Sequence, residues 1–234
     1  MKKSLLFLPG WGMEPSIWGA FSQELEKHFQ CHYLHWRDLA SVAEIDERVA
    51  KAIEEIGQPL SIVGWSLGSI AAIRAAARFP QQVAKLLLIG STARFTKGEQ
   101  APYGTELVAV KRMQRQLARN KEGTLASFYE AMFLPAKHVP MATTFVGDTV
   151  SSLGYGLEYL MSVDVTEEAR SLVIPTLIAH GAQDRVIPVK AATTLLNVIG
   201  GPVTMTIQPE CGHVPFLTAQ EHVLSLCEEG GFLD

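Results

Sequence analysis

Cysteine and long apolar runs are both scarce in this sequence. Its 234 residues include only three cysteines, Cys31, Cys211 and Cys227. They cannot pair completely, and their spacing fits no metal site, so we expect free thiols in a reducing compartment and no bound metal. No apolar stretch approaches the ~20 residues of a membrane-spanning helix. These scarcities argue against a disulfide-rich secreted domain, a cysteine-based metal module and a helical membrane protein.

Charge of one sign is not in excess either. The formal net charge is −4 at pH 7, which gives no sign of a nucleic-acid binder. Lys2 and Lys3 precede an apolar run, as in a signal peptide. That run has only about five residues before Pro9, however, short of the ~7 to 15 that a signal peptide needs. We therefore expect a cytoplasmic, monomeric protein whose first apolar run is a strand.

Strand-like and helix-like segments alternate through most of the chain. With 47% hydrophobic residues, the chain is long enough for one large core. Strand patterns occur at residues 4–8, 31–34, 60–63, 83–89, 173–180 and 203–207, and helical patterns at residues 17–28, 42–56, 69–78, 191–198 and 215–227. Such alternation is typical of the α/β class, in which a mostly parallel sheet has helices on both faces.

The alternation stops between residues 94 and 165. This stretch has no convincing strand pattern, whereas residues 105–120 and 125–133 have helical spacing. A helical block that interrupts a parallel sheet is typical of a lid. We therefore predict a core domain made of residues 1–93 and 166–234, with a helical lid insertion at residues 94–165.

The most specific local signal is Gly64-Trp65-Ser66-Leu67-Gly68. G-x-S-x-G is the pattern of a nucleophile elbow, a strand-to-helix turn so sharp that the neighbours of the serine must be small. The same five residues can also arise by chance in a flexible Ser-Gly loop. The context favours an elbow, because a strand pattern precedes Ser66 and a helical pattern follows it.

A nucleophilic serine needs an imidazole as base and a carboxylate that orients the imidazole. In proteins with such an elbow these residues come in the chain order serine, acid, histidine, after the carboxyl ends of strands. Asp184 follows the strand pattern at 173–180, and His213 follows the one at 203–207. A lone loop aspartate is usually a turn residue, and a lone loop histidine is usually solvated. The other histidines, which compete for the role of base, are His28, His32, His35, His138, His180 and His222.

Acyl transfer also needs hydrogen-bond donors for the oxyanion. The N–H of Leu67, directly after the serine, is the first candidate. The second is the N–H of Trp11 in the loop at residues 9–12, since Pro9 has no N–H to donate. The alternative is a glycine-rich turn that merely joins a strand to a helix.

Taken together, these residues resemble the α/β-hydrolase superfamily over nearly the whole chain, and in particular its BioH-type esterases. These esterases hydrolyse pimeloyl-acyl carrier protein methyl ester in biotin synthesis. The shared motifs are Pro9-Gly-Trp-Gly12 with Trp18, the tryptophan-containing elbow, Gly156-Leu-Glu with Val163-Asp164, and Gly212-His213-Val-Pro-Phe216.

The resemblance implies a triad of Ser66, Asp184 and His213, with Trp11 and Leu67 as oxyanion and substrate contacts. It also implies that His213 and one stretch of the lid contact the substrate. The residues of this stretch are Phe128, Tyr129, Glu130, Ala131 and Met132. The chemistry requires neither a metal nor an organic cofactor.

The match is incomplete in two respects. The usual His-Gly before the oxyanion tryptophan is Pro9-Gly10 here, and lid arginines that hold the acidic carrier protein in the family are replaced by Gly123 and Ser127. Slightly upstream, basic residues recur at helical spacing, namely Lys111, Arg112, Arg115 and Arg119. This basic stripe either steers an acidic partner to the lid or is an ordinary solvated helix face.

We predict a serine carboxylesterase that hydrolyses the methyl ester of a short or medium acyl chain, with the pimeloyl ester on acyl carrier protein as the implied substrate. Phe128, Met132, Phe133 and Leu134 would suit an aliphatic chain, or they are simply lid core. Two alternatives remain open. One is another small-acyl esterase, thioesterase or menaquinone-pathway lyase of the same fold, and the other is a ligand-binding receptor built on it.

Overall fold

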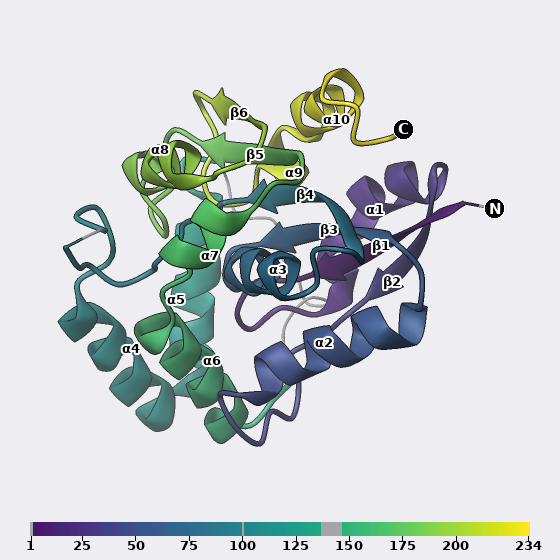
Figure 1. Cartoon of the computed structure of the whole chain (residues 1–234). Coiled ribbons are helices and arrows are strands. Elements are labelled where there is room, and N and C mark those ends of the chain that lie inside the picture. Colours follow the sequence, from purple (N-terminus) through teal and green to yellow (C-terminus); the bar gives the residue numbers. More distant parts are fainter. Residues whose placement is uncertain (1, 100, 137–146) are drawn as a thin grey trace.

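A computed structural model describes residues 2–99, 101–136 and 147–234. Its described residues form a six-stranded sheet in which every neighbouring pair is parallel (Figure 1). The strand order is β2-β1-β3-β4-β5-β6. The strands are β1 (Lys3–Leu8), β2 (Phe29–Tyr33), β3 (Leu60–Trp65), β4 (Val83–Ile89), β5 (Thr176–Gly181) and β6 (Val203–Gln208). The predicted α/β-hydrolase fold class is confirmed.

The central strands are buried along nearly their whole length. All residues of β3 and β5 are buried, and β1 is buried after its first residue. Their continuous apolar runs suit a sheet covered on both faces. The two edge strands, β2 and β6, contain exposed or half-buried residues because each has a neighbour on one side only.

Helices cover both faces of the sheet (Figure 1). On one face, α2 (Glu44–Ile56) packs on α3 (Leu67–Arg78), α3 on α7 (Thr166–Ser171), and α7 on α8 (Val189–Val198). On the other lie η1 (Pro15–Trp18), α1 (Gly19–Glu26), α9 (Pro215–Thr218) and α10 (Gln220–Glu229). Aromatic rings hold this second layer together, with Trp18 and Phe216 4.9 Å apart between ring centroids.

Three helices between β4 and β5 stand to one side of the sheet (Figure 1). They are α4 (Leu107–Arg119), α5 (Lys121–Phe133) and α6 (Val150–Ser162), and α4 packs on the other two. Arg94 and Asp164 pair at the two ends of this insertion. The division into a core and a lid at residues 94–165 stays a prediction.

The sequence patterns missed α6 and α7. Two glycines, Gly154 and Gly156, lie inside α6 and lower its intrinsic helix propensity. Its start is nevertheless capped, because the Thr149 side chain accepts a hydrogen bond of 3.1 Å from the N–H of Ser152. Packing against α4 supplies the stabilisation of helix α6 that its intrinsic propensity does not provide.

Several predicted boundaries differ by a few residues from those in the structure, and two of the differences have a clear local cause. The strand expected at residues 173–180 begins only at Thr176, because Pro175 cannot donate to a ladder and Val173 is 75% exposed. The helix expected at residues 215–227 is divided at Ala219, whose φ of −147° and ψ of 44° are not helical. No described helix combines the length and apolarity required to cross a bilayer.

Candidate active site

The topology of the sheet has a switch point between β1 and β3. From β1 the chain moves to one side to form β2, and from β3 onward it builds the other side. In open parallel sheets, ligands bind at such a switch point, beyond the carboxyl ends of the strands. The loop at residues 9–12 follows β1 at this point, and Ser66 follows β3.

Ser66 has the backbone conformation of a nucleophile elbow. Its φ of 56° and ψ of −118° are strained for a residue with a side chain. The flanking glycines permit the close packing that the turn requires. A Cβ at Gly64 would lie 2.6 Å from the Gly68 oxygen, and one at Gly68 would lie 2.1 Å from the Leu8 oxygen. The predicted strand, turn and helix around Ser66 are therefore all present.

Asp184 and His213 come together from different loops. The Nδ1 atom of His213 lies 2.7 Å from Oδ2 of Asp184, and neither side chain is exposed. The other carboxylate oxygen accepts hydrogen bonds from the N–H groups of Val186 at 2.8 Å and Ile187 at 2.9 Å. Because an ionised carboxylate only accepts, Nδ1 donates and Nε2 carries the lone pair. Nε2 has no hydrogen-bond partner among the described residues.

The loop that bears His213 is fixed to the elbow and to the insertion. The indole N–H of Trp65, next to the serine, donates to the His213 carbonyl at 2.9 Å. On the other side, the His213 N–H donates to the carbonyl of Met132 at 2.9 Å. Beneath the imidazole lies Gly90, where a Cβ would be 2.9 Å from the ring. The position of the imidazole is therefore set by β3, β4 and α5 together.

Burial and hydrogen bonding determine the charges at this site. Burial alone would raise the pKa of Asp184, but the facing His213, its hydrogen bond, His180 and the Ile187 N–H outweigh burial, so the pKa is lowered. Burial also lowers the pKa of His180, against opposing effects of Asp184 and the bond to Ile187. Asp184 is therefore ionised and His180 neutral at pH 7.

The predicted oxyanion donors lie beside the elbow. A Cβ at Gly10 would be 3.3 Å from the Cβ of Ser66, and Gly68 abuts the backbone of Leu8 and Pro9. Among the described residues, the backbone N–H groups of Trp11 and Leu67 donate to no protein acceptor. The ring N–H of Trp11 is occupied, because it donates to the Leu153 carbonyl at 2.8 Å. The backbone N–H groups are thus the atoms available for an oxyanion.

An apolar pocket of about 160 Å³ opens at Ser66. Its walls come from the loop at residues 9–12, from the segment between β4 and α4, from α4, α5 and α6, and from the loop after β5. They comprise Trp11, Phe95, Thr105, Ala109, Val110, Met113, Phe128, Leu157, Leu160 and Val186. An enclosure of this kind suits an aliphatic group.

The predicted lid residues have different surroundings. Phe128 lines the apolar pocket and meets Trp11 edge to face, with ring centroids 5.1 Å apart. Tyr129 donates from its hydroxyl to the Gly12 carbonyl at 3.0 Å, which links α5 to the loop at residues 9–12. Ala131 lines an outer groove, Glu130 is exposed, and Met132 is buried and lines neither cavity.

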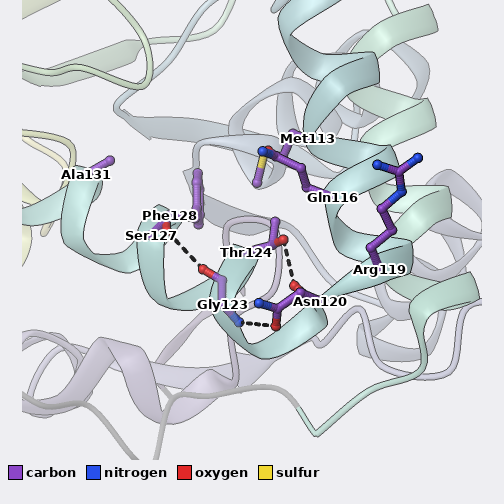
Figure 2. Close-up of a pocket in the computed structure, with 9 residues that line it drawn as sticks. All are labelled: Met113, Gln116, Arg119, Asn120, Gly123, Thr124, Ser127, Phe128 and Ala131. Atoms are coloured by element: carbon purple, nitrogen blue, oxygen red, sulfur yellow. Dashed lines mark hydrogen bonds between the residues drawn. The ribbon is translucent and has the colours of Figure 1, made fainter.

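The outer groove has a volume of about 640 Å³ and lies between α4 and α5 (Figure 2). Met113 and Phe128 line both this groove and the apolar pocket. Figure 2 shows polar groups along the rest of the groove, among them Gln116, Arg119 and Asn120. The groove therefore adjoins the pocket through an apolar wall and offers hydrogen-bonding groups outside it.

All four residues of the basic stripe are exposed on α4. They are Lys111, Arg112, Arg115 and Arg119, and none forms an ion pair within the part of the chain that the structure describes. The helix itself carries no acidic residue. The stripe is therefore a local excess of positive charge on a protein of net charge −4.

Sequence patterns overlooked most of the pocket wall. Leu157 lies within the Gly156-Leu-Glu motif, but Val110 and Leu160 had no distinguishing signal because any amphipathic helix contains such residues. His180 was considered only as a competitor for the base. The structure places it behind Asp184 instead, with Nε2 3.4 Å from Oδ2. His138, another competitor, lies outside the described residues.

A doubly covered parallel sheet with a strained serine after β3 and a buried histidine–carboxylate pair after β5 and β6 defines the class of α/β-fold hydrolases. The chain belongs to the alpha/beta hydrolase family, whose sequence pattern matches residues 5–223. The resemblance recognised in the sequence is thereby confirmed at the level of the superfamily.

Individual relatives narrow the comparison. A pimeloyl-acyl-carrier protein methyl ester esterase of Nitrosomonas europaea is 26% identical, over 94% of this chain and 92% of its own. One of Vibrio vulnificus is 29% identical, over 96% and 91%. An esterase from Exiguobacterium antarcticum has a similar structure, with a TM-score of 0.88 and 20% identity over 98% of this chain and 92% of its own. The resemblance to BioH-type esterases is confirmed, and the prediction of an ester hydrolase agrees with all three names.

Proposed function

We propose that this chain is a serine carboxylesterase that removes the methyl group from a pimeloyl methyl ester carried on acyl carrier protein. The observation that carries the proposal is the buried His213 next to a strained serine elbow. Its Nδ1 is anchored on an ionised Asp184, and its Nε2 has no partner among the residues that the structure describes. The names of the relatives support the substrate.

In the proposed reaction, His213 Nε2 takes the proton of Ser66 as Oγ attacks the ester carbonyl carbon. The N–H groups of Trp11 and Leu67 stabilise the oxyanion. As the tetrahedral intermediate collapses, its bond to the methoxy oxygen breaks, and the imidazolium gives that oxygen its proton to release methanol. Water, deprotonated by His213, then attacks the acyl-serine, and Ser66 leaves with the proton from the imidazolium.

Two surface features support a carrier-bound substrate. The basic stripe on α4 presents exposed cations, with no acidic residue in the same helix, to an acidic partner. The groove between α4 and α5 leads from this helix to the wall of the apolar pocket, and Arg119 belongs to both the stripe and the groove. A long polar arm could therefore lie in the groove while its acyl end reaches Ser66. A cytoplasmic location fits such a substrate.

The direct test is demethylation of purified methyl-pimeloyl acyl carrier protein, followed by mass spectrometry. We expect wild type to demethylate this substrate and Ser66→Ala to leave it unchanged. The surface control Ser225→Ala should demethylate it at the rate of wild type. Wild type, but not Ser66→Ala, should also restore growth of a biotin auxotroph that lacks this esterase.

A fluorophosphonate probe separates the alternatives. The probe could label Ser66, and the protein could hydrolyse small aryl esters, without acting on the carrier-bound ester. This outcome would contradict the proposed substrate and favour another esterase or thioesterase of this fold. Equal labelling of wild type and Ser66→Ala would contradict the proposal that the chain is a serine hydrolase, and would favour a ligand-binding receptor.

A further inference from the structure

A second buried histidine lies behind the Asp184–His213 pair. His180 is in β5, and its side chain has no exposed surface. Its Nε2 lies 2.8 Å from the carbonyl oxygen of Ile187 and 3.4 Å from Oδ2 of Asp184. Because a carbonyl oxygen only accepts, Nε2 carries the proton. This N–H is therefore close to the same carboxylate oxygen that accepts the hydrogen bond of His213.

The bond from His180 closes the loop that bears the acid. Ile187 donates its N–H to Oδ1 of Asp184 at 2.9 Å and accepts the His180 N–H at its own carbonyl. Ile187 is 1% exposed, so water would not readily replace a lost partner. From β5, the imidazole thus holds the carbonyl of the residue whose N–H binds the carboxylate.

The neutrality of His180 matters for this arrangement. Among the described residues, the titratable groups that act on its ring are Asp184 and His213. Its Nδ1 is buried and has no hydrogen-bond partner in the described part of the chain, which gives a second proton no acceptor. A neutral N–H can orient the carboxylate. A cation at this position would instead compete with protonated His213 for the negative charge of Asp184.

We propose that His180 is a positioning residue for the acid of the triad. It fixes the carbonyl of Ile187, whose N–H binds Asp184, and its own N–H lies close to the Asp184 oxygen that orients His213. The inference rests on the proposed function, because it concerns a reaction in which His213 is the base. A histidine that served stability alone would not affect the properties of the Asp184–His213 hydrogen bond.

The test compares His180→Phe, which removes the N–H, with His180→Gln, whose amide nitrogen can replace Nε2. For hydrolysis of p-nitrophenyl acetate, we expect the phenylalanine variant to lose roughly three- to tenfold in kcat with KM changed less than twofold. Glutamine should restore most of the loss. The acid limb of kcat/KM should move to higher pH in the phenylalanine variant, since a carboxylate that loses a donor holds the imidazolium more strongly. His222→Phe, at an exposed position, is the control.

Proton NMR of the free enzyme provides a readout that needs no substrate. The downfield resonance of the His213 Nδ1 proton should shift in His180→Phe and return toward its wild-type position in His180→Gln. If the phenylalanine variant does not fold, His180→Gln can be compared with His180→Asn, whose side chain is shorter. The His213 Nδ1 resonance should then lie close to its wild-type position in His180→Gln and be shifted in His180→Asn. An unchanged resonance, kcat and pH profile in folded His180→Phe would overturn the inference. Absence of ester hydrolysis by wild type would instead contradict the proposed function, and the resonance would still report on His180.

Discussion

The imidazole of His213 rests on a position that has no side chain. Gly90 has a φ of +51°, and a Cβ there would lie 2.9 Å from Cε1 and Nδ1 of the ring. Gly90→Ala should therefore displace the imidazole from Asp184 and lower kcat about tenfold or more, in line with the dependence of catalysis on the position of the base. The measurement is kcat for a small aryl ester together with the thermal unfolding midpoint.

Gly19→Ala is the matched control for this change. Gly19 also has a positive φ, of +43°, but nothing lies within 4 Å of a Cβ there. Both substitutions introduce backbone strain, and only the one at Gly90 adds a contact with His213. If both variants kept wild-type kcat, the packing of the ring on Gly90 would have no catalytic importance.

The lowered pKa of His180 has a consequence for stability. The unfolded chain takes up a proton on this residue below its ordinary pKa of 6.5, whereas the buried ring does not. Its contribution to the free energy of unfolding is therefore full above pH 6.5 and diminishes as the pH falls toward the lowered folded value. We expect urea denaturation to show a smaller loss of stability between pH 7 and pH 5 in His180→Gln than in wild type.

His222→Gln controls for the removal of a histidine from an exposed position. It should lose as much stability as wild type over the same pH interval. An equal loss in all three proteins would contradict the direction of the His180 shift.

Helix α6 packs on Trp11, in the loop at residues 9–12, through a glycine. A Cβ at Gly156 would lie 2.6 Å from Cδ1 of Trp11, whose ring N–H is already bound to the Leu153 carbonyl of the same helix. Gly156→Ala should push the ring and its backbone away from the elbow. Because loss of one oxyanion donor removes about 2.7 to 4 kcal/mol of transition-state stabilisation, even a partial displacement should lower kcat/KM about tenfold.

Gly154→Ala, two residues away in the same helix, has nothing within 4 Å of its Cβ. It should keep wild-type kcat/KM and stabilise the protein by up to about 1 kcal/mol, because alanine favours a helix over glycine. Comparable kinetics in the two variants would show that α6 does not set the position of Trp11.

The charge distribution of the entire molecule predicts how a carrier protein would approach. The net charge is −4, yet α4 presents four exposed cations and no acid. For a carrier-bound ester, kcat/KM should fall as NaCl rises, while hydrolysis of a neutral small ester should not. Arg115→Gln/Arg119→Gln should lower kcat/KM for the carrier-bound ester roughly threefold or more at low salt.

The double variant Lys27→Gln/Lys51→Gln removes the same charge from exposed positions on α1's end and on α2. It should retain the activity and salt dependence of wild type toward the carrier-bound ester. If the two double variants behaved alike, the stripe would be an ordinary solvated face.

Local sequence was sufficient for the elbow and for most of the sheet. Gly64 and Gly68 flank Ser66 because backbone atoms occupy the space where their side chains would be, a constraint that leaves a pattern five residues long. Continuous apolar runs marked the buried strands for a similar reason, since both faces of a central strand exclude water. The chain order of Ser66, Asp184 and His213 also allowed us to predict which loops contain the candidate site residues.

The sequence by itself therefore determined the class of fold, the elbow, and the loops that deliver the acid and the imidazole, because each leaves a short-range pattern. Only the tertiary structure decided which faces of α4, α5 and α6 enclose the pocket, why α6 forms despite its glycines, and that His180 lies against Asp184. These depend on contacts between segments far apart in the chain. Side chains such as Leu160 acquire a role from what packs opposite them, and no spacing along a helix specifies that partner.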